Sequence, residues 1–297
     1  MPQDQYAPKD PTEQHPQPDT TLEQQQHPGR TEAMREEPDH GEESYRGSAR
    51  LPDKVAVITG GDSGIGRAVA IAFAREGADV AIAYLPDEEE DASRTVELVE
   101  KAGRRAVKIP GDLTDEQACQ EVIDRTVREL GGIDILVNNA AYQMAQPEGL
   151  SSITTEQLDR VVKTNLYAMF WLSKQALPHL KEGAVIINTS SIQASQPSPE
   201  LLDYAMTKAA IVNFTKGLAA SLAERGVRVN AVAPGPVWTP LIPATMPDEK
   251  VDGFGEQTPL GRVGQPAELA PAYVFLASQE SSYVTGEVLA VTGGQPM

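Results

Sequence analysis

Short apolar runs alternate with longer segments of helical periodicity from Val55 onward, and few folds accept such a pattern. Consecutive parallel strands need a long crossover connection, which a helix supplies, so this alternation is typical of a parallel sheet with helices on both faces. We therefore predict an α/β fold with a doubly wound parallel sheet of about seven strands. The expected strands cover residues 55–59, 80–84, 106–110, 135–138, 184–188, 227–232 and 288–291. The expected helices cover residues 65–76, 91–102, 115–130, 154–179, 204–224 and 267–277.

The N-terminal segment differs from the rest of the chain. Residues 1–48 are rich in Gln, Pro, Glu and His and have no apolar periodicity, so we expect a polar, largely disordered leader. A leader that packs on a neighbouring subunit is the alternative, with Tyr45 and Leu51 as candidate anchors. Residues 49–297 are then expected to form one domain, since 40% of the chain is hydrophobic and single α/β domains reach about 250 residues.

Composition excludes several classes of partner. The formal net charge of -18 repels nucleic acid and anionic lipid. No apolar run approaches the ~18 residues of a membrane span, and the N-terminus lacks the basic and apolar regions of a signal peptide, so we expect a cytoplasmic protein without a membrane partner. His15, His27 and His40 are too scattered along the leader for a metal site. The single cysteine, Cys119, is expected to be a buried structural thiol, with a nucleophile as the alternative.

A glycine-rich turn joins the first expected strand to the first expected helix. Glycine permits positive φ and a close approach of the backbone to a pyrophosphate, which then lies against the free N–H groups at the positive end of the helix dipole. Gly60, Gly64 and Gly66 fit that task, although glycine-rich turns also occur only to bend a chain. The turn reads Thr59-Gly60-Gly61-Asp62-Ser63-Gly64-Ile65-Gly66.

Part of this turn also resembles the surroundings of a hydrolase serine, with Ser63 as the candidate nucleophile. Such a mechanism needs a histidine base within hydrogen-bond reach. His179 is the only histidine outside the leader, and we expect it at the end of a helix, capping it or facing solvent. The hydrolase interpretation is therefore disfavoured.

Tyr204 and Lys208 lie one turn apart in the helix expected at 204–224. A free phenol titrates near ~10, and an adjacent ammonium favours the phenolate, which makes proton exchange with a substrate oxygen feasible near neutral pH. Alone the pair is weak evidence, because many such pairs are ordinary surface neighbours. Further motifs follow expected strands at their carboxyl ends, where open α/β sheets bind ligands. These motifs are Asn138-Asn139-Ala140-Ala141, Ser190-Ser191 and Pro234-Gly235.

Together these motifs resemble the short-chain dehydrogenase/reductase family, from about Leu51 to the C-terminus. The resemblance implies a single Rossmann-type domain, and a homotetramer packed through the helices at 154–179 and 204–224 and the last strand. Residues 234–243 are further similar to the bacterial glucose/ribitol-dehydrogenase-like group, which includes general stress proteins and also carries a polar leader.

The resemblance implies a role for each of four residues. Tyr204 gives or takes the proton, Lys208 holds the nicotinamide ribose and biases Tyr204 toward phenolate, and Ser191 hydrogen-bonds the reacting oxygen. Asn165 would hold a water that relays protons through Lys208, which also explains a helix-weakening residue in the middle of a helix. Ala141 departs from the family, which usually has glycine at that position.

The same resemblance implies the cofactor contacts. Asn139 is expected to brace the central strand, Asp112 to meet the adenine amino group, and Val237 and Thr239 to contact the nicotinamide carboxamide and the phosphates. The full expected set is Gly60, Asp62, Ser63, Gly64, Ile65, Gly66, Tyr84, Asp112, Leu113, Asn139, Ala140, Tyr204, Lys208, Pro234, Gly235, Val237 and Thr239.

These roles describe an NAD(P)-dependent oxidoreductase that transfers hydride between a nicotinamide cofactor and a small-molecule aldehyde or ketone, or the corresponding alcohol or polyol. A catalytically silent dinucleotide-binding sensor or scaffold of the same fold is the alternative, although the retained Ser191, Tyr204 and Lys208 argue against it. A nucleotide-sugar epimerase also uses a Tyr/Lys pair, but little chain is left after the seventh strand for a sugar-nucleotide domain. Residues 241–259 are expected to form an irregular lid that sets the substrate.

The choice between NAD and NADP depends on the end of the second strand. An acid ~20 residues beyond the glycine turn normally takes the ribose hydroxyls of NAD, while a basic residue accepts the 2′-phosphate of NADP. Tyr84 and Leu85 hold these positions, so neither feature is present. Asp62 and the acids at 87–90 favour NAD by their negative potential, although a helix start also favours acids. Arg67 is the nearby cation that could still reach a phosphate.

Overall fold

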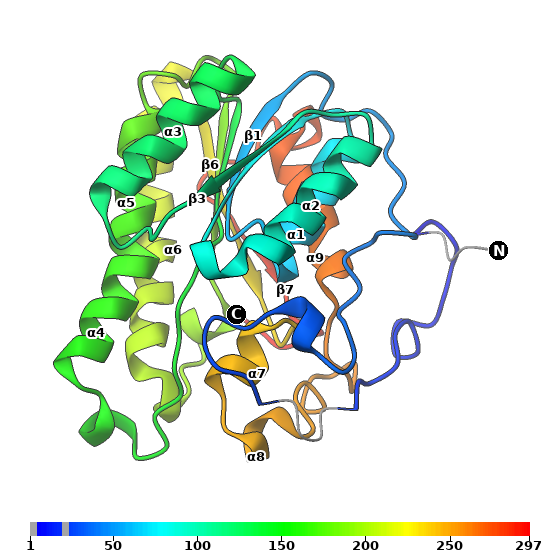
Figure 1. Ribbon diagram of the computed structural model, residues 1–297, viewed down its shortest axis with the longest axis vertical. Helices are drawn as coiled ribbons and strands as arrows, with labels where there is room; N and C mark the ends of the chain where they lie inside the picture. Colours follow the sequence, from blue (N-terminus) through cyan, green and yellow to red (C-terminus); the bar gives the residue numbers. More distant parts are fainter. Residues whose placement is uncertain (1–4, 20–23) are drawn as a thin grey trace.

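The computed structural model describes residues 5–19 and 24–297 of the chain (Figure 1). Its centre is a seven-stranded, all-parallel sheet with the strand order β3-β2-β1-β4-β5-β6-β7. The direction of winding reverses between β1 and β4, which leaves a crevice at their carboxyl ends. The predicted fold class is confirmed. The strands are β1 (Val55–Thr59), β2 (Asp79–Tyr84), β3 (Ala106–Pro110), β4 (Ile135–Asn138), β5 (Val185–Thr189), β6 (Arg228–Pro234) and β7 (Val288–Val291).

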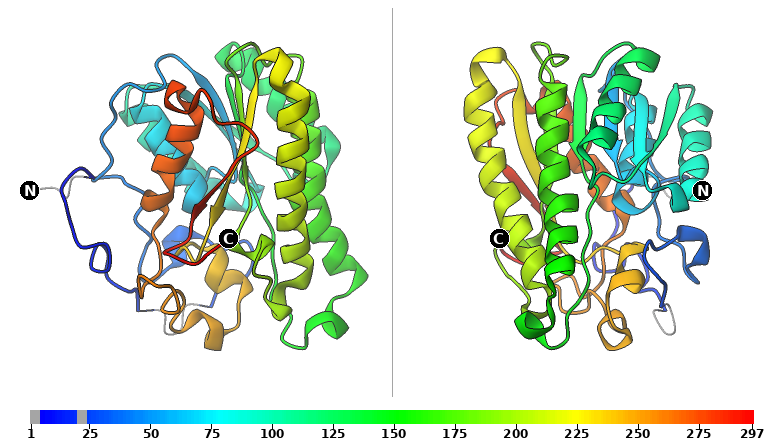
Figure 2. Two further views of the ribbon diagram at one scale, coloured as in Figure 1. Left: turned by 180° about the vertical axis from the view of Figure 1, so that it is seen from behind. Right: turned by 60° about the vertical axis from the view of Figure 1, so that its left-hand side comes forward.

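Helices cover both faces of the sheet, as Figure 2 shows in two further views. One face carries α1 (Gly64–Arg75), α2 (Glu89–Lys101) and α9 (Pro266–Ala277). The other carries α3 (Glu116–Leu130), α4 (Thr155–Val162), α5 (Ala168–Ala176) and α6 (Leu202–Leu222). The short helices α7 (Leu241–Thr245) and α8 (Asp248–Val251) lie beyond the carboxyl ends of the strands. Within the described residues, no helix is long and apolar enough to span a membrane.

The apolar alternation is explained by two buried clusters, one on each face of the sheet. The cluster on the first face includes Phe73 of α1 and Tyr273 of α9, and the cluster on the second includes Ile123 of α3 and Leu136 of β4. Cys119 lies in the second cluster with no exposed surface, and burial raises the pKa of its thiol to about 12. The predicted structural thiol is therefore confirmed.

The long helix predicted at 154–179 is interrupted. A π-helical segment, Lys163–Tyr167, separates α4 from α5, and α5 ends at Ala176. Asn165 lies inside this segment, and its side chain bonds the backbone of Tyr142, a residue outside the helix. Single π-helical turns inside helices occur frequently at functional sites.

Several residues of the leader contact the domain, while residues 6–13 are exposed, and the largely disordered leader stays a prediction. Met34 packs in a small cluster with Trp238, whose indole Nε1 donates to the backbone oxygen of Glu36 at 2.9 Å. The Tyr45 hydroxyl donates to Glu76 at 2.7 Å, so the expected anchor is present, although it holds the leader to its own subunit. Composition predicted a solvated segment because the leader has few apolar residues. The contacts between the leader and the domain are made largely by polar side chains and backbone groups. Residues 1–4 and 20–23 of the leader lie outside the described residues.

Candidate active site

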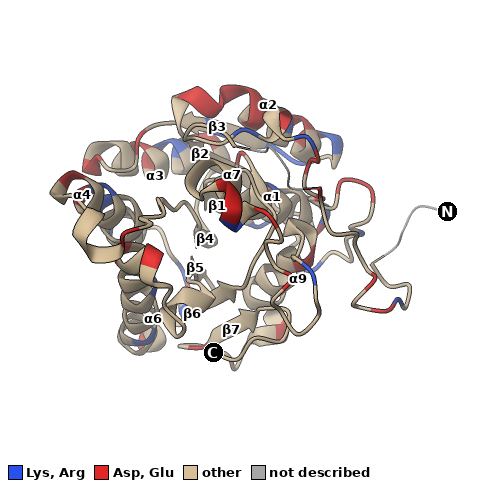
Figure 3. Cartoon of the chain, turned by 90° about the horizontal axis from the view of Figure 1, so that it is seen from below, with Lys and Arg blue, Asp and Glu red and all other residues tan. Residues whose placement is uncertain are grey.

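A cleft of about 440 Å³ opens at the carboxyl end of the sheet, over the crevice between β1 and β4. Figure 3 looks onto this end of the molecule, where α7 lies across the strands and acidic residues occur along α2. Almost all of the residues predicted for catalysis or cofactor binding line the cleft. The exceptions are Gly66 and Asn165, which lie behind its wall.

The glycine turn has the geometry of a dinucleotide cradle. Gly60 and Gly64 have φ values of +60° and +47°, which residues other than glycine rarely adopt. A Cβ on Gly66 would lie 1.8 Å from the backbone oxygen of Gly60, so only glycine lets α1 begin this close to β1. The free N–H groups at the start of α1 are thereby directed at the cleft, and they fit a pyrophosphate.

Two carboxyls border the cradle. Asp62 is 1% exposed, and its Oδ2 has no hydrogen-bond partner among the described residues. Burial raises the pKa of Asp62 to about 6, and burial together with the Asp62 charge raises the pKa of Glu88 to about 9. An unpartnered carboxyl oxygen in a ligand-sized cleft fits a hydroxyl donor such as the cofactor ribose.

Arg67 is not available to a phosphate in this arrangement. Its NH2 lies 2.5 Å from Oδ1 of Asp91, and its Nε donates to the backbone oxygen of Asp62 at 2.8 Å. Both side chains of the ion pair are nearly buried, at 4% and 5% exposure. Arg67 therefore joins the glycine turn to α2.

Tyr204, Lys208 and Ser191 lie together in the wall of the cleft. The Lys208 Nζ lies 5.2 Å from the centre of the Tyr204 ring and donates to the backbone oxygen of Thr189 at 2.8 Å. Burial raises the pKa of Tyr204 to about 12, against a hydrogen bond with Ser191 that lowers it. Burial also lowers the pKa of Lys208 to about 7.

These values bear on one sequence-based expectation. An adjacent ammonium was expected to bias Tyr204 toward phenolate, whereas burial raises the pKa of Tyr204 in the opposite direction, and the expected role of Lys208 stays a prediction. The ammonium is likewise penalised by burial, because it has exchanged water for one backbone oxygen. The sequence shows that the two groups are neighbours but not how deeply they are buried.

Asn165 has partners other than substrate or cofactor. Its Oδ1 accepts from the backbone N–H of Tyr142 at 2.8 Å, and its Nδ2 donates to Tyr142 O at 2.9 Å and to the Thr207 hydroxyl at 3.0 Å. It thus fixes the segment after β4 against α6. The water relay expected for it stays a prediction.

Asn139 and Asp112 both line the cleft, after β4 and β3 respectively. The backbone N–H of Asn139 donates to the Thr59 hydroxyl at 2.9 Å, and its side chain donates to Thr59 O at 3.0 Å and to Gly60 O at 3.2 Å. It therefore ties the end of β4 to the glycine turn. Asp112, after β3, lies 3.3 Å from the guanidinium of Arg160.

Several cleft residues were not predicted from the sequence. His27, Pro28 and Gly29 come from the leader, and Arg160 comes from α4. Tyr142 directly follows the Asn-Asn-Ala-Ala motif, and this position in the sequence could have indicated that Tyr142 lines the cleft. Nothing in the local sequence of the leader indicates a place in the cleft, because its contacts are with distant residues.

Comparisons with known proteins decide the family. A family model described as enoyl-(acyl carrier protein) reductase matches residues 60–295. General stress protein 39 of Bacillus subtilis is 53% identical over 271 residues, which cover 91% of this chain and 94% of that protein. The chain belongs to the short-chain dehydrogenase/reductase family. The match to a general stress protein also confirms the predicted group, and 91% of the chain is more than the domain alone, so the match extends into the leader.

Two other relatives of this dehydrogenase/reductase have names that state an activity. NADPH-dependent aldehyde reductase 1 of Arabidopsis thaliana is 48% identical, with 91% of this chain and 95% of that protein covered. Glucose and ribitol dehydrogenase of Daucus carota is 47% identical, with 91% and 94% covered. Among solved structures, a Burkholderia cenocepacia short-chain dehydrogenase in complex with NADP matches with a TM-score of 0.77 and 36% identity, covering 82% of this chain and 98% of that one. The chain is therefore an NAD(P)-dependent oxidoreductase.

Proposed function

We propose that this enzyme interconverts aldehydes or ketones and the corresponding alcohols or polyols, with Tyr204 as the acid/base. The observation that carries this proposal is that Ser191, Tyr204 and Lys208 line the same cleft as the glycine cradle, with the Lys208 Nζ 5.2 Å from the centre of the Tyr204 ring. The names of the relatives, an aldehyde reductase and a glucose and ribitol dehydrogenase, support the substrate class.

The proposed roles follow from the positions of the groups. A carbonyl oxygen that accepts hydrogen bonds from both Ser191 and Tyr204 would be polarised, and Tyr204 would then donate its proton as the alcohol forms. The Lys208 ammonium beside the ring would stabilise the phenolate left on Tyr204. The nicotinamide cofactor would donate the hydride in reduction and accept it in oxidation.

Replacing Lys208 by Ala should weaken both turnover and cofactor binding. Unchanged cofactor affinity in this variant would contradict the role of Lys208 at the ribose.

We also propose a preference for NAD over NADP. A 2′-phosphate near Asp62 would meet a buried carboxyl that is ionised above its pKa of about 6, while Arg67 is held by Asp91. The NADPH-dependent relative and the NADP complex favour the opposite choice. Asp62→Asn should shift the ratio of kcat/KM values toward NADP, whereas Glu97→Gln, which neutralises an exposed acid of α2, should not.

The experiment for the function is a panel of aldehydes, ketones, sugars and polyols, assayed with both cofactors in both directions. Turnover of at least one carbonyl or polyol class is expected. Cofactor binding without turnover of any class would favour the silent-sensor alternative. An advantage of about tenfold for NADP, equal to ~1.4 kcal/mol, would overturn the proposed cofactor preference.

A homotetramer is also proposed. An apolar face on the π-helical segment, α5 and α6 is formed by Leu166, Tyr167, Met169, Phe170, Trp171 and Phe214. Tyr167 and Phe170 are 49% and 51% exposed there, which is the surface expected of a subunit interface. Analytical ultracentrifugation would test this oligomeric state.

A cytoplasmic location of the protein stays a prediction from the sequence.

A further inference from the structure

We propose that residues 25–34 of the leader, here called the strap, are part of the cofactor-binding site and retain the bound dinucleotide. The proposal rests on cofactor binding by the cleft, which family membership supports. His27, Pro28 and Gly29 line the cleft together with the glycine turn and Tyr204. The strap thus adds a wall that the dehydrogenase domain alone does not supply.

One end of the strap is attached at α7. The backbone N–H of Gln25 donates to Pro243 O at 3.0 Å, and the Gln25 side chain bonds both backbone groups of Arg30, at 2.8 and 3.2 Å, which closes the intervening residues into a loop. A Cβ on Gly29 would lie 2.2 Å from Pro240 O, so the loop can approach α7 only with glycine at this position.

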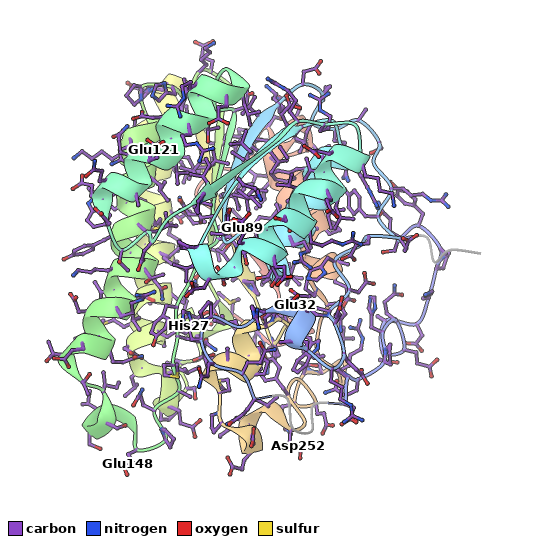
Figure 4. All side chains as sticks on the ribbon, in the orientation of Figure 1. His27, Glu32, Glu89, Glu121, Glu148 and Asp252 are labelled. Atoms are coloured by element: carbon purple, nitrogen blue, oxygen red, sulfur yellow. The ribbon has the colours of Figure 1, made fainter. Side chains whose placement is uncertain are left out.

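The middle of the strap reaches the opposite wall of the cleft. The ring of His27 lies edge-on to Tyr142, with 4.9 Å between ring centres, and the guanidinium of Arg160 lies over the same Tyr142 ring at 5.5 Å. Arg160 in turn pairs with Asp112 after β3. Figure 4 shows His27 beside the chain that follows β4 and Glu32 below α2, with the strap between them.

The other end of the strap is attached at α2. The backbone N–H of Thr31 donates to Oδ2 of Asp91 at 2.8 Å in a buried position. Asp91 is the carboxylate that holds Arg67, and Arg67 bonds the carbonyl of Asp62 in the glycine turn. One carboxylate therefore connects the strap to the cradle, and Met34 then buries its side chain beside Trp238.

The consequence is a cleft closed on a side where cofactor would otherwise exchange with solvent. The strap spans from α7 across the chain after β4 to the start of α2, so a dinucleotide lying from the glycine turn to Tyr204 would be covered by it. Release of the cofactor would then require the strap to lift, and bound cofactor would in turn hold the strap in place.

The test uses the full-length chain and two variants that loosen the strap at different points. Gly29→Ala introduces the clash with Pro240, and Thr31→Pro removes the N–H that bonds Asp91. Proline fits the backbone there, because Arg30 is extended and Thr31 begins a short helix. The matched controls are Gly132→Ala, where a Cβ meets nothing within 4 Å, and Thr31→Ala, which keeps the N–H.

Stopped-flow chase of bound NADH or NADPH by excess oxidised cofactor measures the release rate. We expect release to be about five- to tenfold faster in both strap variants, the effect of about one hydrogen bond, and unchanged in the controls. Trypsin cleavage after Arg30 gives a readout that does not depend on activity, and saturating cofactor should slow that cleavage in the unmodified chain.

Unchanged release in both strap variants, slower release in either, or cleavage at Arg30 that cofactor does not slow would each overturn the proposal. Slower release would mean that the strap competes with the cofactor instead of retaining it. Failure of the unmodified protein to bind either NADH or NADPH is a different result, because it would contradict the assignment of the cleft as a cofactor site.

Discussion

Replacing Arg67 by Ala should destabilise the protein without changing its choice of cofactor. Arg67 and Asp91 form a nearly buried ion pair with 2.5 Å between nitrogen and oxygen. Removing one partner of such a pair costs about 3–5 kcal/mol, because the remaining charge is buried without compensation. Thr31 still donates to Asp91, so we expect the lower end, about 3 kcal/mol in the free energy of unfolding.

Urea unfolding of Arg67→Ala, Asp91→Ala and the double variant measures this effect. The double variant should lose less than the sum of the single variants, since no charge is stranded in it. The ratio of kcat/KM values for NAD and NADP should stay at that of the unmodified enzyme. A loss below about 1 kcal/mol, typical of an exposed pair, or a selective loss of NADPH binding would refute the structural role given to Arg67.

Three further predictions follow from buried groups. Cys119 should resist thiol reagents in the native protein and react after unfolding, because burial raises the pKa of its thiol to about 12; rapid native labelling would contradict this. Gly66→Ala should cost about 1–3 kcal/mol of stability or more and weaken cofactor binding, because its Cβ would overlap Gly60 O, while Gly132→Ala should do neither. Burial raises the pKa of Glu76, but hydrogen bonds from Arg50 and Tyr45 lower it more, to about 2. A depressed carboxyl pKa stabilises the fold above the ordinary value of 4.5 and loses that effect as the pH falls toward 2, so stability should fall in this window and Glu76→Gln should flatten the profile.

The sheet and the position of the cleft could be predicted from the sequence because both depend on local patterns. Alternating apolar runs place the strands, and motifs at strand ends come together because parallel strands end at one edge. The π-helical segment could not be predicted, since it accompanies a bond from Asn165 to the distant backbone of Tyr142. The strap was missed for the same reason, because Thr31 and Gly29 look like ordinary residues of a polar leader until Asp91 and Pro240 are placed beside them.

The titration of Tyr204 is another property that spacing cannot supply. The four-residue spacing from Tyr204 to Lys208 predicts that the two groups are neighbours, but the pKa of each group depends on how much water surrounds it. Both are buried in the structure, at 8% and 2% exposure, and this burial moves the phenol away from phenolate. The role that we propose for Lys208 is therefore to stabilise the charge that develops on Tyr204 during turnover.

The most direct test of the account is Tyr204→Phe, assayed for turnover and for NADH and NADPH binding on the same preparation. The variant deletes the hydroxyl and keeps the buried ring, so turnover should be lost while cofactor affinity stays close to that of the unmodified enzyme. Tyr283→Phe, which removes a hydroxyl from a fully exposed side chain, should leave both quantities unchanged. Near-normal turnover in Tyr204→Phe would contradict the assignment of Tyr204 as the acid/base.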